Sequence, residues 1–450
     1  MKLKRYINLA LIVLLVLSYG CSNSSENEYS YPTVISGIVR NTGGQLLSYT
    51  KISLTTAPDY QSVWTDENGT FRLENFPSGK HKLKAEHVGY NDYTADIPSA
   101  INGTSVLNPV LSVKTYNIPI VKPVSKGTVR INGKALETDF DGDGIYTPFK
   151  VKGVAFSPTP INNKPYLNGI DDRSIQLLKE MNANTIRTYS GTGKYFLQNA
   201  APNGIRVIVS FWVDTNYDLS SADIRQKVKD EFARMVLDFK DYSAVLMWNL
   251  GNEQNYQNGN NSNWYSLAQE LAVEAYKVEG EKFHPVCINN GNIYNIGDAS
   301  LNADDNSLTY VDLWATNIYE YNIATKLNEY KNKSGKPIVV TEYGIDALDN
   351  RTKLEYENMQ AAFDSVNWAQ IKASDDVCVG ATVFEFTDEW WKGGTPAIHD
   401  YGGYPTSAHP DGYSNEEWWG IIATSPDTNG DGLDEWRPRK VYYMFQRNWK

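Results

Sequence analysis

From about residue 129 to the end of the chain, short apolar segments alternate with amphipathic ones. Eight apolar segments are predicted to be buried strands, at residues 151–157, 184–189, 206–212, 244–250, 285–289, 312–319, 337–341 and 377–386. Between them apolar residues recur at helical spacing, as in Ile224, Val228 and Phe232, with Ser221 as the expected N-cap. Eight strands that alternate with helices over about 320 residues predict a (β/α)8 barrel, the TIM barrel.

The main alternative for this region is a doubly wound parallel sheet. That fold usually carries a glycine-rich phosphate-binding turn after one of its strands. Neither G-x-G-x-x-G nor G-K-[ST] follows any of the eight predicted strands. The pattern therefore favours the closed barrel over the open sheet.

Charge and composition narrow the range of functions. The 450 residues include 53 acidic and 42 basic side chains, and the resulting net charge of −11 disfavours nucleic-acid binding. The five histidines form no paired metal-binding motif, and the isolated Cys287 and Cys378 are predicted to be buried thiols. Signatures for nucleotides, flavins and haem are absent from the sequence, so we expect chemistry that needs no cofactor.

The first twenty residues have the pattern of a secretory signal peptide. Three basic residues within the first five positions precede the apolar run of residues 9–17, which is too short to span a bilayer. The run ends in Ser18-Tyr19-Gly20-Cys21, which resembles a bacterial lipobox. The resemblance implies export, lipidation of Cys21 and anchoring to a bacterial membrane, with the outer membrane favoured. Cleavage as a plain signal peptide, with an incidental Cys21, is the alternative.

After a polar linker at residues 21–32, residues 33–113 show short strands separated by turn signals and no long helical period. Phe71 and Leu73 alternate with polar residues and are expected to face a core. This pattern predicts a small β-sandwich. Residues 65–90 closely resemble the carboxypeptidase-regulatory-like domain, which implies an accessory module without catalytic groups. A connector at residues 114–128 leads to the barrel, residues 129–450.

Two predicted barrel strands lead directly into glutamates. The strand at 244–250 is followed by Gly251, Asn252 and Glu253, and the strand at 337–341 is followed by Glu342. In this fold the chemistry lies at the carboxyl ends of the strands. A carboxylate at the mouth of an apolar strand is costly to desolvate unless it is paired or used. Two carboxyl groups that face each other across a pocket are what glycosidic bond cleavage requires.

The segments around both glutamates resemble motifs of glycoside hydrolase clan A, especially the family 2-type barrels. These segments are WNLGNE, which ends at Glu253, and VVTEYG, which contains Glu342. The similarity covers residues 129–450 and includes KGVAFSP and NTIRTYS, which are also found in the fungal glucanosyltransferase branch. The resemblance implies a retaining hydrolase of β-linked glycosides or β-glucan, with Glu253 as the acid/base and Glu342 as the nucleophile.

The same resemblance implies roles for further residues. Asn252 would bind the sugar 2-hydroxyl, Arg187 would keep Glu342 ionised, and Tyr319 would donate a hydrogen bond to Glu342. Aromatic side chains would hold the sugar rings, and Trp390 is favoured over its neighbour as the floor of the catalytic subsite. The aromatic candidates are Trp390, Trp391, Trp212 and Tyr189.

Two aspartate-rich loops resemble the first half of a calcium-binding loop, with oxygen ligands at alternate positions and glycine at the sixth. The candidate ligands are Asp139, Asp141 and Asp143 in one loop and Asp427, Asn429 and Asp431 in the other. Neither loop has a glutamate at its twelfth position. A bound calcium ion would be structural and remote from the two glutamates.

Three functions remain open at this point. The first is a lipid-anchored retaining glycosidase or endo-β-glucanase that acts on an oligosaccharide or polysaccharide. The second is a β-glucan transglycosylase, in which an acceptor sugar replaces water. The third is a non-catalytic glycan-binding lipoprotein, which the presence of both carboxylates disfavours. The sugar, the linkage, endo or exo action and the oligomeric state are not specified by these motifs.

Overall fold

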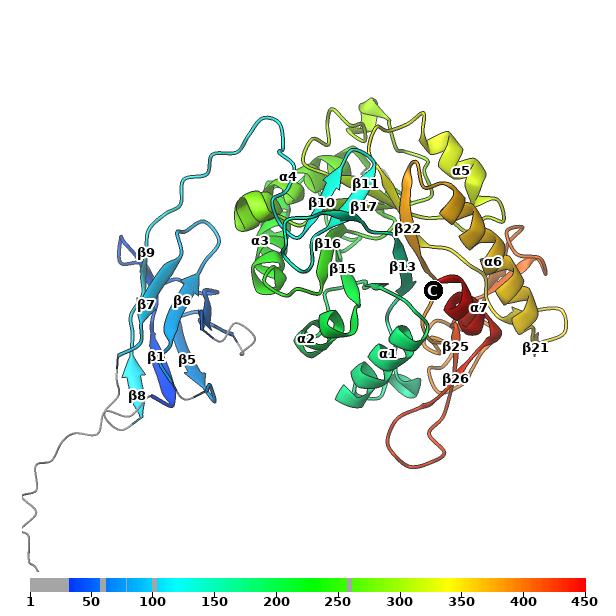
Figure 1. Cartoon of the computed structure of the whole chain (residues 1–450), viewed down its shortest axis with the longest axis horizontal. Coiled ribbons are helices and arrows are strands. Elements are labelled where there is room, and N and C mark those ends of the chain that lie inside the picture. Colours follow the sequence, from blue (N-terminus) through cyan, green and yellow to red (C-terminus); the bar gives the residue numbers. More distant parts are fainter. Residues whose placement is uncertain (1–31, 57–61, 78, 99–102, 257–260) are drawn as a thin grey trace, which may run out of the picture.

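The computed structural model describes residues 32–56, 62–77, 79–98, 103–256 and 261–450. They form an N-terminal β-sandwich-like domain and a C-terminal barrel, joined by an extended connector (Figure 1). The predicted signal peptide and Cys21 lie outside the described residues. Within the described part of the chain, none of the helices has both the length and the apolar character needed to span a bilayer.

The N-terminal domain pairs two small sheets face to face. One has the order β5 (Thr70–Glu74), β1 (Val34–Ile38), β8 (Thr104–Val106), and the other β4 (Val63–Trp64), β3 (Lys51–Leu54), β6 (Lys82–Glu86), β7 (Tyr93–Asp96). A further pair joins β2 (Arg40–Asn41) to β9 (Val110–Leu111). Phe71 and Leu73 are buried in the shared core while Arg72 is exposed, so the predicted alternation is confirmed.

Eight parallel strands close into a barrel, which confirms the predicted fold and excludes the doubly wound sheet. Each predicted strand overlaps one observed strand. In barrel order these are β13 (Val151–Ala155), β14 (Thr185–Arg187), β15 (Arg206–Phe211), β16 (Val245–Leu250), β17 (Val286–Gly291), β18 (Leu313–Asn317), β19 (Ile338–Glu342) and β22 (Cys378–Val383). Cys287 and Cys378 lie on two of them as buried free thiols, as predicted.

Helices surround the barrel and bury their apolar faces against it (Figure 1). The Ser221 hydroxyl accepts a hydrogen bond from the Ile224 amide, so it caps its helix as expected. The helices are α1 (Asn168–Glu180), α2 (Lys194–Ala200), α3 (Ala222–Phe239), α4 (Asn261–Glu279), α5 (Ile323–Tyr330), α6 (Glu357–Ala373) and α7 (Lys440–Asn448), with 3-10 turns η1 (Ile161–Asn163), η2 (Ala201–Asn203), η3 (Gln254–Tyr256), η4 (Gly280–Lys282) and η5 (Ala299–Leu301).

A small antiparallel sheet closes the amino-terminal end of the barrel. It comprises β10 (Val129–Asn132), β11 (Ala135–Thr138) and β12 (Thr147–Pro148). Val129 and Leu136 from this sheet pack into the apolar interior of the barrel, against Leu246 and Val339. The interior of the barrel is thus filled by side chains at this end. Short hairpins complete the fold: β20 (Leu348–Asp349) with β21 (Leu354–Glu355), β23 (Gly403–Pro405) with β24 (Tyr413–Asn415), and β25 (Ile422–Ser425) with β26 (Glu435–Pro438).

Buried charges join the two domains at the end of α3. The Lys51 ammonium donates hydrogen bonds to the carbonyl oxygens of Leu237 (2.9 Å) and Asp238 (3.2 Å), and it lies 3.4 Å from a carboxylate oxygen of Asp241. A cation at this position satisfies the terminal carbonyl groups of a helix and its dipole. Glu86 is also buried and forms an ion pair with Lys240 at 3.1 Å.

We expect the substitution Lys51→Met to weaken this interdomain contact by about 1–3 kcal/mol, the usual cost of leaving buried polar partners unsatisfied. Hydrogen exchange should then become faster in peptides from β3 and from the end of α3. The matched control is Lys82→Met in the same domain, because the Lys82–Asp96 pair is 3.7 Å apart and exposed. Equal exchange in the two variants would contradict a fastening role for Lys51.

Candidate active site

A pocket of about 400 Å³ opens at the carboxyl ends of the barrel strands. Both candidate glutamates line it, together with Asn252, Tyr189 and Tyr319 from the predicted site. The full lining is Ser157, Tyr189, Trp212, Asn252, Glu253, Tyr319, Glu342, Phe384, Glu389, Trp391, Lys392, Tyr404, Glu416 and Trp419. Residues that are far apart in sequence therefore converge on one concave surface.

Glu342 is the last residue of β19 and is held on three sides. Its Oε1 accepts hydrogen bonds from the Arg187 guanidinium (2.7 Å) and the Tyr189 hydroxyl (2.9 Å). Its Oε2 accepts a hydrogen bond from the Tyr319 hydroxyl. Burial, followed by the charge of Glu342, raises the pKa of both tyrosines well above the usual range, so both remain donors. These contacts stabilise the ionised carboxylate and fix its orientation.

Glu253 lies two residues beyond Gly251, just after β16. The backbone turns here through two left-handed positions, with φ of 68° at Gly251 and 56° at Glu253. The Glu253 amide donates to the Asn289 carbonyl (3.1 Å), and its Oε1 accepts from the Asn317 amide group (3.0 Å). Burial, followed by the negative charge of Glu342, raises the pKa of the Glu253 carboxyl to about 7.

A chain of hydrogen bonds connects the two glutamates. Arg187 donates both to Glu342 and to the Asn252 side-chain oxygen (2.8 Å). Asn317 donates to the same Asn252 oxygen (3.2 Å) and to Glu253. Because two donors use the oxygen of Asn252, its amide NH2 is oriented as a donor. Although burial alone would lower the pKa of Arg187, Tyr189 and Glu342 raise it, so the guanidinium stays charged.

The predicted aromatic platforms are only partly brought together. Trp391 and Trp212 line the pocket, and each is nearly half exposed. Trp390 does not line it: its ring stacks on His399, with centroids 4.6 Å apart. The apolar wall instead consists of Phe384 and Trp419, whose rings lie 5.3 Å apart and both pack against Tyr319.

Several residues in or beside the pocket were not identified from the sequence. Asn317 does not line the pocket but donates to Glu253 from the end of β18, so a polar residue at a barrel strand end was the available signal. Phe384 directly follows β22, and Glu416 and Trp419 lie between β24 and β25. Ser157, Glu389 and Lys392 come from loops, where the pattern of the sequence gives no direction for a side chain. Tyr404 comes from the short strand β23.

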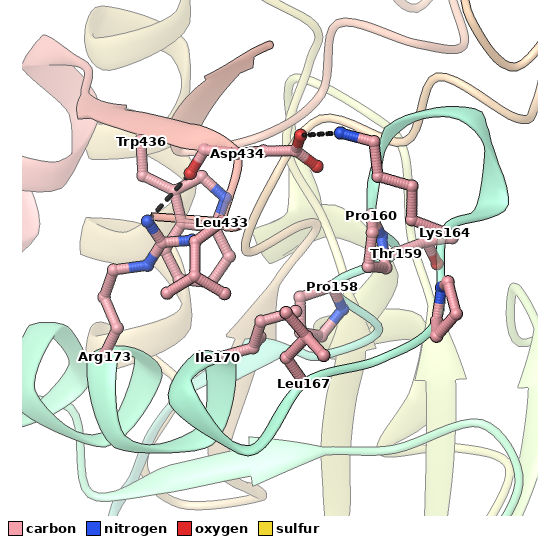
Figure 2. A pocket seen from close by; sticks show the side chains of 12 residues that line it. Pro158, Thr159, Pro160, Lys164, Leu167, Ile170, Arg173, Leu433, Asp434 and Trp436 are labelled. Atoms are coloured by element: carbon pink, nitrogen blue, oxygen red, sulfur yellow. Dashed lines mark hydrogen bonds and ion pairs between the residues drawn. The ribbon is translucent and has the colours of Figure 1, made fainter. Parts of the chain in front are cut away.

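A second hollow at the rim of the barrel is too small for a sugar. Its cavity volume is about 20 Å³, and Asp434 lies at its edge (Figure 2). The Asp434 carbonyl accepts from Arg173 (2.8 Å), while its carboxylate accepts from the Ile161 amide (2.7 Å) and lies 3.4 Å from Lys164. Figure 2 shows the contacts of Asp434 with Arg173, on α1, and with Lys164, in the loop after β13. These contacts hold the segment before β26 against α1 and the loop after β13.

The two aspartate-rich loops differ in how their first carboxylate is satisfied. Asp139, Asp141 and Asp143 bring carboxylate oxygens within 4.8 Å of one another. Asp139 is buried, and although its Oδ2 accepts from the Gly144 amide, its Oδ1 has no hydrogen-bond partner. In the other loop both oxygens of Asp427 accept backbone hydrogen bonds, from Gly430 (2.7 Å) and Gly432 (2.9 Å). Only the first loop therefore leaves a buried carboxylate oxygen for a cation.

Comparison with solved structures agrees with this architecture. The chain is similar to a β-galacturonidase from Eisenbergiella tayi (14% identity, TM-score 0.51, 89% of this chain and 66% of that one). It is also similar to a β-D-glucuronidase from Dictyoglomus thermophilum (17%, 0.50, 94% and 64%) and a β-glucuronidase from Ruminococcus gnavus (16%, 0.52, 93% and 63%). At these identities the likeness shows the fold alone, and the chain spans less than two thirds of each relative.

Family models match both domains, whereas no curated protein matches the sequence. Residues 34–112 match the carboxypeptidase regulatory-like domain, as the sequence resemblance predicted. Residues 162–395, slightly more than half of the chain, match the TIM barrel domain of glycosyl hydrolases family 2. Two glutamates converge at the open end of this barrel. On the evidence of its barrel domain, the protein belongs to glycosyl hydrolase family 2.

Proposed function

We propose that the protein is a retaining glycoside hydrolase that cleaves β-linked glycosides by double displacement. The observation that carries this proposal is the unequal environment of two glutamates in one pocket. Glu342 is paired with the buried Arg187 at 2.7 Å, whereas burial raises the pKa of Glu253 to about 7. One carboxyl group is thereby kept charged for attack while the other retains a proton for donation.

In the first step Glu342 attacks the anomeric carbon and forms a glycosyl ester. The bond to the leaving oxygen breaks, and this oxygen takes the proton of Glu253. Tyr189 and Tyr319 hold the attacking carboxylate through hydrogen bonds that orient its oxygens. The amide NH2 of Asn252 is directed to donate to the sugar 2-hydroxyl, an interaction that strengthens in the transition state.

In the second step the roles of the proton groups reverse. Formation of the ester removes the negative charge of Glu342, which is one cause of the raised pKa of Glu253. The pKa of Glu253 should therefore fall, so its carboxylate can accept a proton from water. The water oxygen attacks the anomeric carbon, the ester bond breaks, and Glu342 is released as a carboxylate.

The stereochemistry of the product tests this proposal. We would screen β-1,3-, β-1,4- and β-1,6-linked oligosaccharides, size the products, and follow a cleaved substrate by proton NMR at early times. The expected first product is the β-anomer, which then mutarotates. An α-anomer as the first product would contradict double displacement, because single displacement inverts the configuration. Longer products at high acceptor concentration would instead favour the transglycosylase.

We also propose that the enzyme is exported and held to a bacterial membrane through lipidated Cys21. The support is the lipobox-like Ser18-Tyr19-Gly20-Cys21 after a short apolar run. Several acyl chains on one residue give stable membrane anchoring. Metabolic labelling with a fatty acid should label the wild type and leave Cys21→Ser unlabelled. An unlabelled wild-type protein in the soluble fraction would contradict anchoring.

Calcium at the loop of Asp139, Asp141 and Asp143 is a further expectation. The partnerless Oδ1 of buried Asp139 supports a cation there, since oxygen ligands are those that calcium prefers. We expect calcium to raise the free energy of unfolding by about 2.7 kcal/mol at 100 times its dissociation constant. The stabilisation should disappear in Asp141→Asn and persist in Asp427→Asn. Equal stabilisation of both variants, or none in the wild type, would contradict this site.

A further inference from the structure

The charges that line the catalytic pocket are unbalanced. Among its lining residues are four carboxylic acids and a single basic side chain, Lys392. The charge of Glu342 is compensated by Arg187, which lies behind it at 2.7 Å and is fully buried. Glu253 holds its proton below a pKa of about 7. The remaining charged groups of the lining are therefore Glu389, Glu416 and Lys392.

The single ammonium group is already occupied. Lys392 Nζ lies 2.8 Å from Glu389 and 3.6 Å from the buried Glu385, and it stands 4.1 Å from the centre of the Phe384 ring. The other oxygen of Glu389 accepts a hydrogen bond from Ser157. Burial, followed by the charge of Glu389, raises the pKa of Glu385 well above its usual range. Lys392 and Glu389 thus form a compensated pair.

Glu416 is a further carboxyl group on the pocket wall, and Lys392 interacts with it only at a longer distance than with Glu389. The Oε1 of Glu416 accepts a hydrogen bond from the Ser414 hydroxyl (2.8 Å). Among the ion pairs of the described residues, none includes Glu416. A carboxylate of this kind accepts hydrogen bonds from sugar hydroxyl groups. A substrate carboxylate would instead lose its hydration, meet a like charge, and find the only ammonium already paired.

We propose that this pocket selects glycosides whose bound sugar is uncharged and rejects the corresponding uronides, with Glu416 as a specificity-determining residue. The inference rests on the proposed function and deepens it. It separates this chain from the similar solved structures, which are described as a galacturonidase and glucuronidases. The distinction between neutral sugars and uronides rests on Lys392, which is already paired with Glu389. A pocket that binds uronides needs a cation that is free to pair with the carboxylate of the substrate.

Matched substrate pairs test the inference. Values of kcat/KM would be measured for aryl β-glucosides and β-glucuronides, for β-galactosides and β-galacturonides, and for uronic-acid polysaccharides before and after chemical reduction of their carboxyl groups. We expect the neutral member of a pair to be preferred by about 100-fold or more. In Glu416→Gln that preference should shrink by about tenfold. The control Glu320→Gln, outside the pocket lining, should retain it.

Each other outcome has a distinct meaning. Uronides cleaved as well as their neutral partners, with the activity lost in Lys392→Met, would overturn the inference and leave the glycosidase intact. An unchanged preference in Glu416→Gln would overturn the role of that residue. Cleavage of neither member of any pair, or an inverted product, would refute the proposed function itself.

Discussion

Replacing the proposed nucleophile, Glu342→Gln, is expected to lower kcat by roughly 10⁴-fold or more, the scale of the loss when an enzyme's covalent nucleophile is removed. Glutamine has nearly the same shape, but it cannot form the glycosyl ester. Its single amide oxygen can accept from Tyr189 or from Tyr319 but not from both, because the two hydroxyls donate to different oxygens of Glu342. Because the shape is kept, sugar binding should be largely retained. The measurements are turnover of a substrate found in the screen and calorimetric binding of the same oligosaccharide.

The matched control is Glu320→Gln, since Glu320 lies outside the pocket lining, and its contacts with Asn292 (3.0 Å) and Lys326 (3.6 Å) do not involve the two glutamates. It should turn over substrate like the wild type. Melting curves of both variants would show that loss of turnover does not reflect unfolding. Turnover in Glu342→Gln that equals the wild type would remove Glu342 from the mechanism.

Replacing the proposed acid/base, Glu253→Gln, should have an effect that depends on the leaving group. For sugar leaving groups, which need a proton, the first step should slow by about 10²–10⁴-fold, the range typical of general acid catalysis. For a dinitrophenolate leaving group, which needs no proton, the first step should change little. Comparing kcat/KM for the two classes of substrate in the wild type and the variant measures this difference.

The pH dependence follows from the same residue. The pKa of Glu253 is raised to about 7, and the first step requires its protonated form, so kcat/KM should fall as pH rises above about 7. Well below pH 7 Glu253 already holds its proton, so a further decrease in pH should not raise kcat/KM through this residue. In Glu253→Gln this alkaline decrease should vanish. Its persistence in the variant would assign the titration to another group.

The barrel and its two glutamates could be predicted because both follow from local patterns. Parallel strands that are buried on both faces appear as continuous apolar runs, as in β16 and β19. The carboxyl ends of such strands meet at one end of a barrel, so Glu253 and Glu342 were expected in one pocket despite their separation in sequence. The alternation around Phe71 identified the sandwich core for a similar reason.

The rest of the site depends on contacts that no local pattern encodes. Strand eight was predicted to run to Phe386, but β22 ends at Val383, which brings Phe384 rather than Trp390 to the pocket. Trp390 instead stacks on His399, nine residues later in the chain, a contact that no local pattern indicates. Asn317 acquires its importance only from Asn252 and Glu253, more than sixty residues earlier in the chain.

The measurement that tests the central claim most directly is chemical trapping of the covalent intermediate. A 2-deoxy-2-fluoro glycosyl fluoride of the sugar identified by the screen would be incubated with the enzyme, and the digested protein analysed by mass spectrometry. We predict one added glycosyl group, located on the peptide that contains Glu342 and absent from Glu342→Gln. A label on Glu253 or another carboxylate, or time-dependent inactivation without any covalent label, would contradict the account.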